Sequence, residues 1–158
     1  ACRESTAPKL LEREWYMAFT ESPPQTSTSA TVLVIDDEET DLQYWSDTVR
    51  NCGSNYTVLR AHDCKSGLSI CRDRAVDCVL LDLNMEESGF KALVDLIPDR
   101  KRPEIAVIIF TRLVHPTLAE IAKHNGAQAY LVKQHTSAEE LDTAIQRAVC
   151  AVKYMLDH

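Results

Sequence analysis

Five short, mostly apolar runs, each followed by a longer amphipathic segment, constrain the fold of this chain more than any other feature. The runs read TVLVI, YTVLRA, DCVLLDL, IAVIIFT and QAYLV, at residues 31–35, 56–61, 77–83, 105–111 and 128–132. Apolar, β-branched runs of this length predict strands that are buried on both faces, as in a parallel sheet covered by helices. Strands that alternate with helices favour an α/β fold, a doubly wound (βα)5 sandwich with a five-stranded parallel sheet.

The segments that follow the five runs carry helix signals. They span residues 38–53, 64–74, 89–98, 115–127 and 137–156. In the first of them Leu42, Trp45 and Val49 lie on one face, as an amphipathic helix requires. The fourth has Pro116 in its first turn and Gly126 after its end, the usual placement of these residues at helix termini. The helical spacing therefore agrees with the doubly wound fold.

The N-terminal part of the chain differs from the rest. Residues 1–19 form an extension in which an apolar residue recurs at every fourth position from Leu11 to Phe19, which predicts a short helix. Residues 20–30 are rich in Pro, Ser and Thr and have the composition of a linker. We expect the folded domain to occupy residues 31–156.

Composition narrows the class of protein. Seventeen Lys and Arg against 24 Asp and Glu give a net charge of −7, which argues against a direct nucleic-acid surface. No apolar run approaches the roughly 20 residues that cross a bilayer, so we expect a soluble, cytoplasmic protein that does not enter a membrane. The six cysteines form no CxxC pair, which favours reduced, mostly buried thiols over a zinc site.

Polar side chains stand at the carboxyl ends of four predicted strands. Asp36 and Asp37 end the first strand, Asp82 the third, Thr111 the fourth, and Lys133 follows the fifth. Because the carboxyl ends of parallel strands meet at one edge of the sheet, we expect these side chains to share a pocket. The pocket would hold three carboxylates, one hydroxyl and one ammonium group.

Three neighbouring carboxylates repel one another unless a cation joins them. Oxygen ligands select a hard ion, so the pocket is predicted to bind Mg²⁺, with Mn²⁺ as an alternative. One carboxylate could then act as a nucleophile toward a phosphoryl group, as aspartates do in covalent phosphoryl transfer. Lys133 would neutralise the phosphoryl oxygens, and Thr111 would donate a hydrogen bond to one of them.

Four stretches together resemble one family, the receiver domain of two-component response regulators. VIDDEE, VLLDLNM, IIFT and GAQAYLVKQ are similar to its acidic pair, phosphoacceptor loop, hydroxyl position and lysine segment, in order. The resemblance implies a flavodoxin-like (CheY-like) fold, with Asp82 as the phosphoacceptor and Asp37 as a direct Mg²⁺ ligand. Asp82 would also face the metal. It further implies that Asp36 holds the ion through water and that the backbone carbonyl of Asn84 is another ligand.

The resemblance also implies a signalling role. A receiver takes its phosphoryl group from a histidine kinase or a histidine phosphotransfer protein, and it does not turn over a separate substrate. Thr111 and Tyr130 correspond to the residues that report phosphorylation to the surface. That surface, residues 115–127, 128–132 and 137–156, would be the site of possible self-association.

The chain departs from the family at four positions near the predicted pocket. Glu86 replaces the usual proline and Gly89 arrives one residue early, so we expect a shorter, more acidic loop after the phosphoacceptor. Arg112 follows Thr111 where a small residue is usual, and we expect it to obstruct part of the pocket mouth. Gln134 replaces the proline after the lysine, which weakens the expectation of a cis peptide bond there.

Three other functions fit parts of the sequence. A haloacid-dehalogenase-like phosphatase also uses an aspartate nucleophile, but its nucleophile precedes its acidic metal pair, and here Asp36 and Asp37 precede Asp82. A receiver-like module that binds partners without phosphorylation remains an alternative, although such modules usually lose the acids that this chain keeps. A flavodoxin-like cofactor site would need a phosphate-binding loop after the first strand, and the acids there would repel a phosphate.

Overall fold

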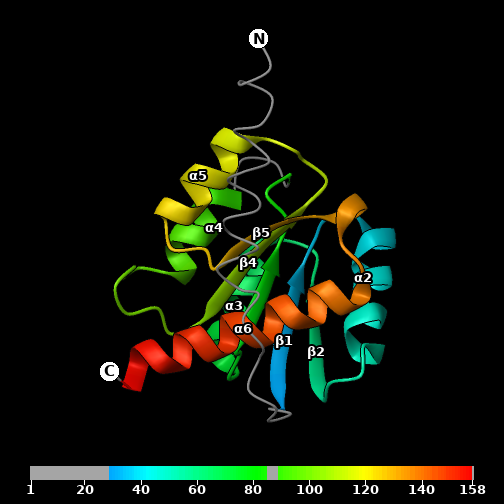
Figure 1. Ribbon diagram of the computed structural model, residues 1–158, viewed down its shortest axis with the longest axis horizontal. Helices are drawn as coiled ribbons and strands as arrows, with labels where there is room; N and C mark the ends of the chain where they lie inside the picture. The colour runs from blue at the N-terminus through cyan, green and yellow to red at the C-terminus, as the bar shows by residue number, and fades with distance from the viewer. Residues whose placement is uncertain (1–28, 85–88, 158) are drawn as a thin grey trace.

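The computed structural model describes residues 29–84 and 89–157 and has a parallel sheet with helices on both faces (Figure 1). The strands are β1 (Ala30–Ile35), β2 (Tyr56–Ala61), β3 (Cys78–Leu81), β4 (Ala106–Thr111) and β5 (Ala129–Val132). The helices are α2 (Glu39–Asn51), α3 (Cys64–Asp73), α4 (Gly89–Leu96), α5 (Pro116–His124) and α6 (Ala138–Asp157), with a 3₁₀ turn, η1, at Lys133–His135. The predicted fold class is confirmed.

Some expectations fall on other parts of the chain. The helix predicted within residues 1–19, the linker up to residue 28 and the acidic loop containing Glu86 lie outside the described residues. At the boundary of the predicted linker, β1 begins at Ala30, one residue earlier than expected.

The strand order is β2-β1-β3-β4-β5, and every neighbouring pair is parallel. In the sheet, β2 lies on one side of β1, and the chain then crosses to the other side of β1 to form β3. The order of the strands therefore reverses between β1 and β3, which is the point where doubly wound folds place their functional sites.

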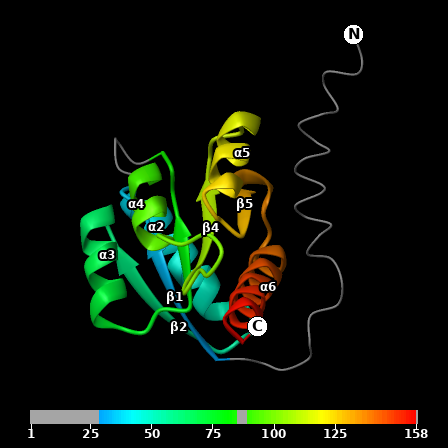
Figure 2. The ribbon, with the colours of Figure 1, turned by 90° about the vertical axis from the view of Figure 1, so that its left-hand side faces the viewer.

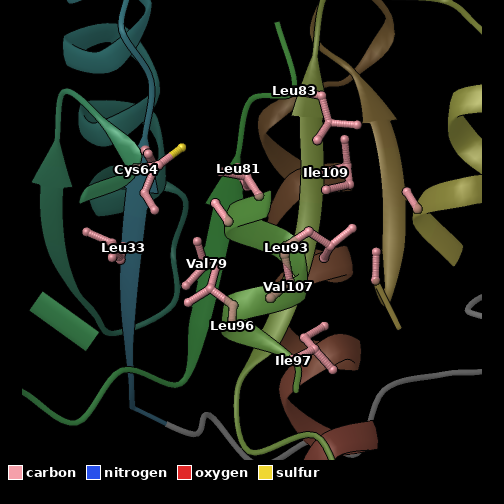
Figure 3. Packing of buried hydrophobic residues seen from close by; sticks show 14 of the residues in the cluster. Leu33, Cys64, Val79, Leu81, Leu83, Leu93, Leu96, Ile97, Val107 and Ile109 are labelled. Carbon is pink, nitrogen blue, oxygen red and sulfur yellow. The ribbon is translucent and has the colours of Figure 1, made fainter. Parts of the chain in front are cut away.

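Alternate residues of each strand pack against opposite helical layers. Leu33 and Ile35 of β1 belong to the core under α3, α4 and α5, whereas Val32 and Val34 belong to the core under α2 and α6. Helices α3 and α6 lie on opposite sides of the sheet (Figure 2). In the first core, Leu93 of α4 and its neighbours pack beside the side chains of β3 and β4 (Figure 3). None of the helices among the described residues is long and apolar enough to span a membrane.

Local signals fix the starts of three helices. The Asp63 carboxylate accepts a hydrogen bond from the Ser66 N–H at the start of α3. His115 Nδ1 accepts one from an N–H in the first turn of α5, where Pro116 is the first residue. Ser137 Oγ accepts the Glu140 N–H at the start of α6. These caps satisfy N–H groups that have no partner within the helix, and so they set where each helix begins after the strand that precedes it.

Candidate functional site

The sequence-predicted polar residues of the strand ends lie at one edge of the sheet. The parallel ladder continues one residue past β1 and β3: the Asp36 N–H donates to the last carbonyl of β2 (3.1 Å) and the Asp82 N–H to the last carbonyl of β1 (3.2 Å). Thr111, the last residue of β4, pairs in register with the last residue of β5, and Lys133 follows directly. This common register brings the side chains of Asp36, Asp82 and Lys133 together.

Lys133 is the centre of this cluster. Its Nζ donates to one oxygen each of Asp36, Asp41 and Asp82, at 3.0 Å for the last two. The Lys133 side chain is only 2% exposed. Burial on its own lowers the pKa of a lysine, but the hydrogen bond to Asp36 and the charge of Asp82 outweigh it, so the pKa of Lys133 lies above its ordinary value. The buried lysine therefore stays charged at neutral pH.

The two strand-end carboxylates are also held by the backbone. The second oxygen of Asp36 accepts the Glu38 N–H, and that of Asp82 accepts the Asn84 N–H, each at 2.9 Å. Such turns over two residues fix the direction of an aspartate side chain. Desolvation raises the pKa of Asp36, and the hydrogen bond from Lys133 offsets only part of this effect. The ionised form of Asp36 is thus disfavoured by its surroundings.

Three further predicted site residues, Thr111, Asp37 and Asn84, lie at or just after the ends of β4, β1 and β3. Thr111 is fully buried, and its hydroxyl oxygen accepts the Leu113 N–H at 3.3 Å, which leaves its own proton to donate. Asp37 and Asn84 are exposed beside the cluster. Within residues 29–84 and 89–157, no three Asp, Glu, His or Cys side chains are arranged as a metal-ion cluster, and Asp36 and Asp82 are directed at Lys133.

A second ion pair, which sequence reasoning missed, borders the cluster. Arg112 Nε donates to Asp41 Oδ2 at 3.0 Å, and its terminal nitrogen donates to Asp41 Oδ1 at 2.7 Å, a two-point contact. The Asp41 side chain is 11% exposed and that of Arg112 is 52% exposed. The hydrogen bonds from Arg112 hold the pKa of Asp41 below its ordinary value despite its burial. Asp41 therefore links Arg112 to Lys133.

A sequence signal for Asp41 was available. Asp41, Trp45 and Val49 are spaced by four residues, so they lie on one row of α2, and all three are buried. A charged residue in the buried row of a helix needs a partner of opposite charge. Arg112, already unusual for its position, was a candidate for that partner.

Tyr130 and Gln134 connect β5 to the loop that follows β4. The Tyr130 hydroxyl donates to the Leu113 carbonyl at 2.6 Å, and the residue is 8% exposed. Gln134 Nε2 donates to the Arg112 carbonyl at 3.4 Å. Among the described residues no peptide bond is cis, so the bond between Lys133 and Gln134 is trans. Tyr130 in this structure is directed inward and holds the loop after β4.

Known proteins resemble this chain in sequence and in fold. The model of the response regulator receiver domain family matches residues 32–146. Protein PilH of Pseudomonas aeruginosa is 31% identical over 105 residues, which are 66% of this chain and 85% of that protein. The polar-differentiation response regulator DivK of Brucella ovis is 25% identical over 103 residues, 65% of this chain and 82% of that protein.

A solved structure gives the same result. The crystal structure of a response regulator receiver domain protein from Clostridium thermocellum has a TM-score of 0.69 and 34% identity, covering 79% of this chain and 98% of that one. The family match extends over most of the described strands and helices. The chain belongs to the response regulator receiver domain family of two-component systems.

Proposed function

We propose that this domain accepts a phosphoryl group on Asp82 from a histidine kinase or a histidine phosphotransfer protein. The observation that carries the proposal is the position of the Asp82 carboxylate. It lies at the switch point of the sheet, with one oxygen on the Lys133 ammonium and the other on the Asn84 N–H. A carboxylate held in this way has a fixed direction and a cation beside it for the incoming charge.

The transfer follows from these groups. An Asp82 oxygen attacks the phosphorus of the donor, and the bond from phosphorus to the donor's imidazole nitrogen breaks, with the electron pair going to that nitrogen. Lys133, kept charged by its neighbours, neutralises the phosphoryl oxygens, and the Thr111 hydroxyl donates to one of them. Hydrolysis of the acyl phosphate returns the free Asp82, so no separate substrate is turned over.

The donor groups of the pocket fit a divalent cation by chemistry and by charge. The pocket contains two cations, Arg112 and Lys133, and four carboxylates, those of Asp36, Asp37, Asp41 and Asp82. Two negative charges are therefore left to compensate. Carboxylate and carbonyl oxygens are ligands for Mg²⁺, and Mn²⁺ is also suitable. We assign Asp37, Asp82 and the backbone carbonyl of Asn84 as direct ligands, and Asp36 as a ligand through water. The bound ion would supply positive charge to the phosphoryl oxygens.

A small phosphoryl donor tests the proposal. Incubation with acetyl phosphate and Mg²⁺ should add the mass of one phosphoryl group to the intact protein, and chelation of the metal should prevent it. Asp82→Asn removes the nucleophile but keeps the size of the side chain, so that variant should gain no mass. Full labelling of Asp82→Asn would refute the assignment of the acceptor, and absence of labelling in the native protein would refute the proposed function.

The output is proposed to run through Thr111 and Tyr130 to a surface formed by α5, β5 and α6, which is also the candidate self-association surface. Ile121 of α5, 42% exposed, is one apolar side chain there. A phosphoryl group that draws Thr111 and Lys133 inward would change the conformation of the loop after β4. The Tyr130 hydroxyl donates a hydrogen bond to that loop.

Hydrogen exchange with and without beryllofluoride, a phosphoryl mimic, tests this output. Changed protection should extend from the pocket to α5 and the start of α6. In Tyr130→Phe, which lacks the hydroxyl that bonds the loop, the change in α5 should be smaller. Changes confined to the pocket residues would mean that the domain relays or stores phosphoryl groups without switching this surface.

A further inference from the structure

One carboxylate outside the strand ends, that of Asp41, binds both cations of the pocket. Its Oδ2 accepts from Lys133 Nζ and from Arg112 Nε, each at 3.0 Å, and its Oδ1 accepts from the Arg112 terminal nitrogen at 2.7 Å. Asp41 comes from the first turn of α2, whereas both cations follow the ends of strands. The unphosphorylated carboxylate of Asp82 accepts a hydrogen bond from one of these two cations, Lys133.

Arg112 is linked to the acceptor through shared partners, because Asp41 accepts from both Arg112 and Lys133, and Lys133 also donates to Asp82. It is the residue directly after Thr111, and besides Asp41, the charges of Asp36 and Asp82 help to raise its pKa. Its side chain is about half exposed, so its guanidinium can move without unpacking the core. The hydrogen bond from Gln134 goes to the Arg112 carbonyl, so it does not restrain the guanidinium group.

Phosphorylation would change the balance between the two carboxylates. A phosphoryl group carries close to two negative charges and offers three strong acceptor oxygens, whereas the aspartate offers one charge and two oxygens. The planar fork of an arginine pairs with a phosphoryl group as well as with a carboxylate. The group of higher charge should therefore attract both cations away from Asp41.

We propose that Asp41 is an internal substitute for the phosphoryl group. While Asp82 is unphosphorylated, Asp41 holds Arg112 and Lys133. Phosphorylation of Asp82 then transfers Arg112 from Asp41 to the phosphoryl oxygens. The inference rests on the proposed function of Asp82 and adds a competing residue and a second phosphoryl-binding cation to it. Arg112 then binds the phosphoryl group directly, and Asp41 acts as a positioning residue through both cations.

The affinity for beryllofluoride in the presence of Mg²⁺ measures this competition. Asp41→Asn releases both cations and should tighten binding about five-fold, while Arg112→Ala should weaken it about five-fold, the size expected of one partly exposed charge pair. In the Arg112→Ala background, Asp41→Asn should have a smaller effect, because only Lys133 is left to release. Asp47→Asn is the matched control: it removes an ion-pair carboxylate from the same helix, 3.0 Å from Arg50, and should leave the affinity unchanged.

The native protein gives a second readout that does not depend on any Asp41 variant folding. The Nε–H signal of Arg112, identified by its absence in Arg112→Lys, should shift in a nitrogen–proton spectrum when beryllofluoride binds. An unmoved signal, or an Asp41→Asn effect of equal size with and without Arg112, would overturn the exchange. If beryllofluoride binds no variant and acetyl phosphate labels none, the proposed function fails and this inference with it. Binding that is equal in all variants would refute this inference alone.

Discussion

Asp36 is the residue at which burial and charge oppose each other most directly. Its side chain is 3% exposed, and it accepts hydrogen bonds from Lys133 and from the Glu38 N–H. Desolvation nevertheless raises the pKa of Asp36, and the neighbouring charge of Asp82 raises it further. An ionised Asp36 therefore costs free energy in the folded state at neutral pH, a cost that functional sites often carry.

Asp36→Asn should raise the free energy of unfolding at neutral pH, by on the order of 1 kcal/mol. The amide keeps an acceptor for the Glu38 N–H, and Lys133 keeps Asp41 and Asp82. The pKa of Asp36 in the folded state lies above its ordinary value of 3.8, so protonated Asp36 stabilises the fold. This contribution to the free energy of unfolding is fully present below pH 3.8 and is lost as the pH rises through the folded-state pKa. The advantage of the variant should therefore be greatest at neutral pH and shrink in acid.

Urea unfolding of the native protein and of Asp36→Asn, from below pH 3.8 to neutral pH, checks the prediction. Asp47→Asn, which loses an exposed ion pair on α2, should change stability by only a few tenths of a kcal/mol. An Asp36→Asn variant less stable than the native protein at neutral pH would mean that the Lys133 pair outweighs the desolvation of Asp36.

At the scale of elements, two helices end on glycines in the left-handed region of backbone conformation. Gly126 follows α5 with φ +96°, and Gly53 follows α2 with φ +98°. Side chains other than glycine rarely adopt this conformation, so these residues let the chain turn back toward β5 and β2. The surroundings differ, because a Cβ at Gly126 would lie 3.0 Å from Ile97 Cγ2 and one at Gly53 would meet nothing within 4 Å.

The two glycines form a matched pair for a stability experiment. Gly53→Ala should lower the free energy of unfolding by about 1 kcal/mol, the cost of the left-handed conformation alone. Gly126→Ala should lower it by about 2 kcal/mol, since Ile97 is buried in the core and must also shift. Denaturant unfolding measures both, and equal losses would show that the contact with Ile97 is relieved at no cost.

At the scale of the whole molecule, the sheet explains which parts of the site were predictable from the sequence. Strand-end residues such as Asp36, Asp82 and Lys133 meet because parallel strands with right-handed crossovers must bring their carboxyl ends to one edge, and short apolar runs identify those ends. The pair of Asp41 and Arg112 spans 71 positions and joins a helix to a loop across the edge of the sheet. Its formation depends on side-chain length and direction, which the spacing of apolar residues does not encode. The inward hydrogen bond of Tyr130 is of the same kind.

The most direct test of the central claim, that Asp82 is the phosphoacceptor, is chemical identification of the modified residue. Sodium borohydride reduces an acyl phosphate to an alcohol, which converts the phosphorylated aspartate into homoserine, and peptide mass spectrometry then locates that residue. After treatment with acetyl phosphate and Mg²⁺, we predict homoserine at position 82 alone. Homoserine at position 36, 37 or 41, with an unchanged aspartate at position 82, would contradict the assignment.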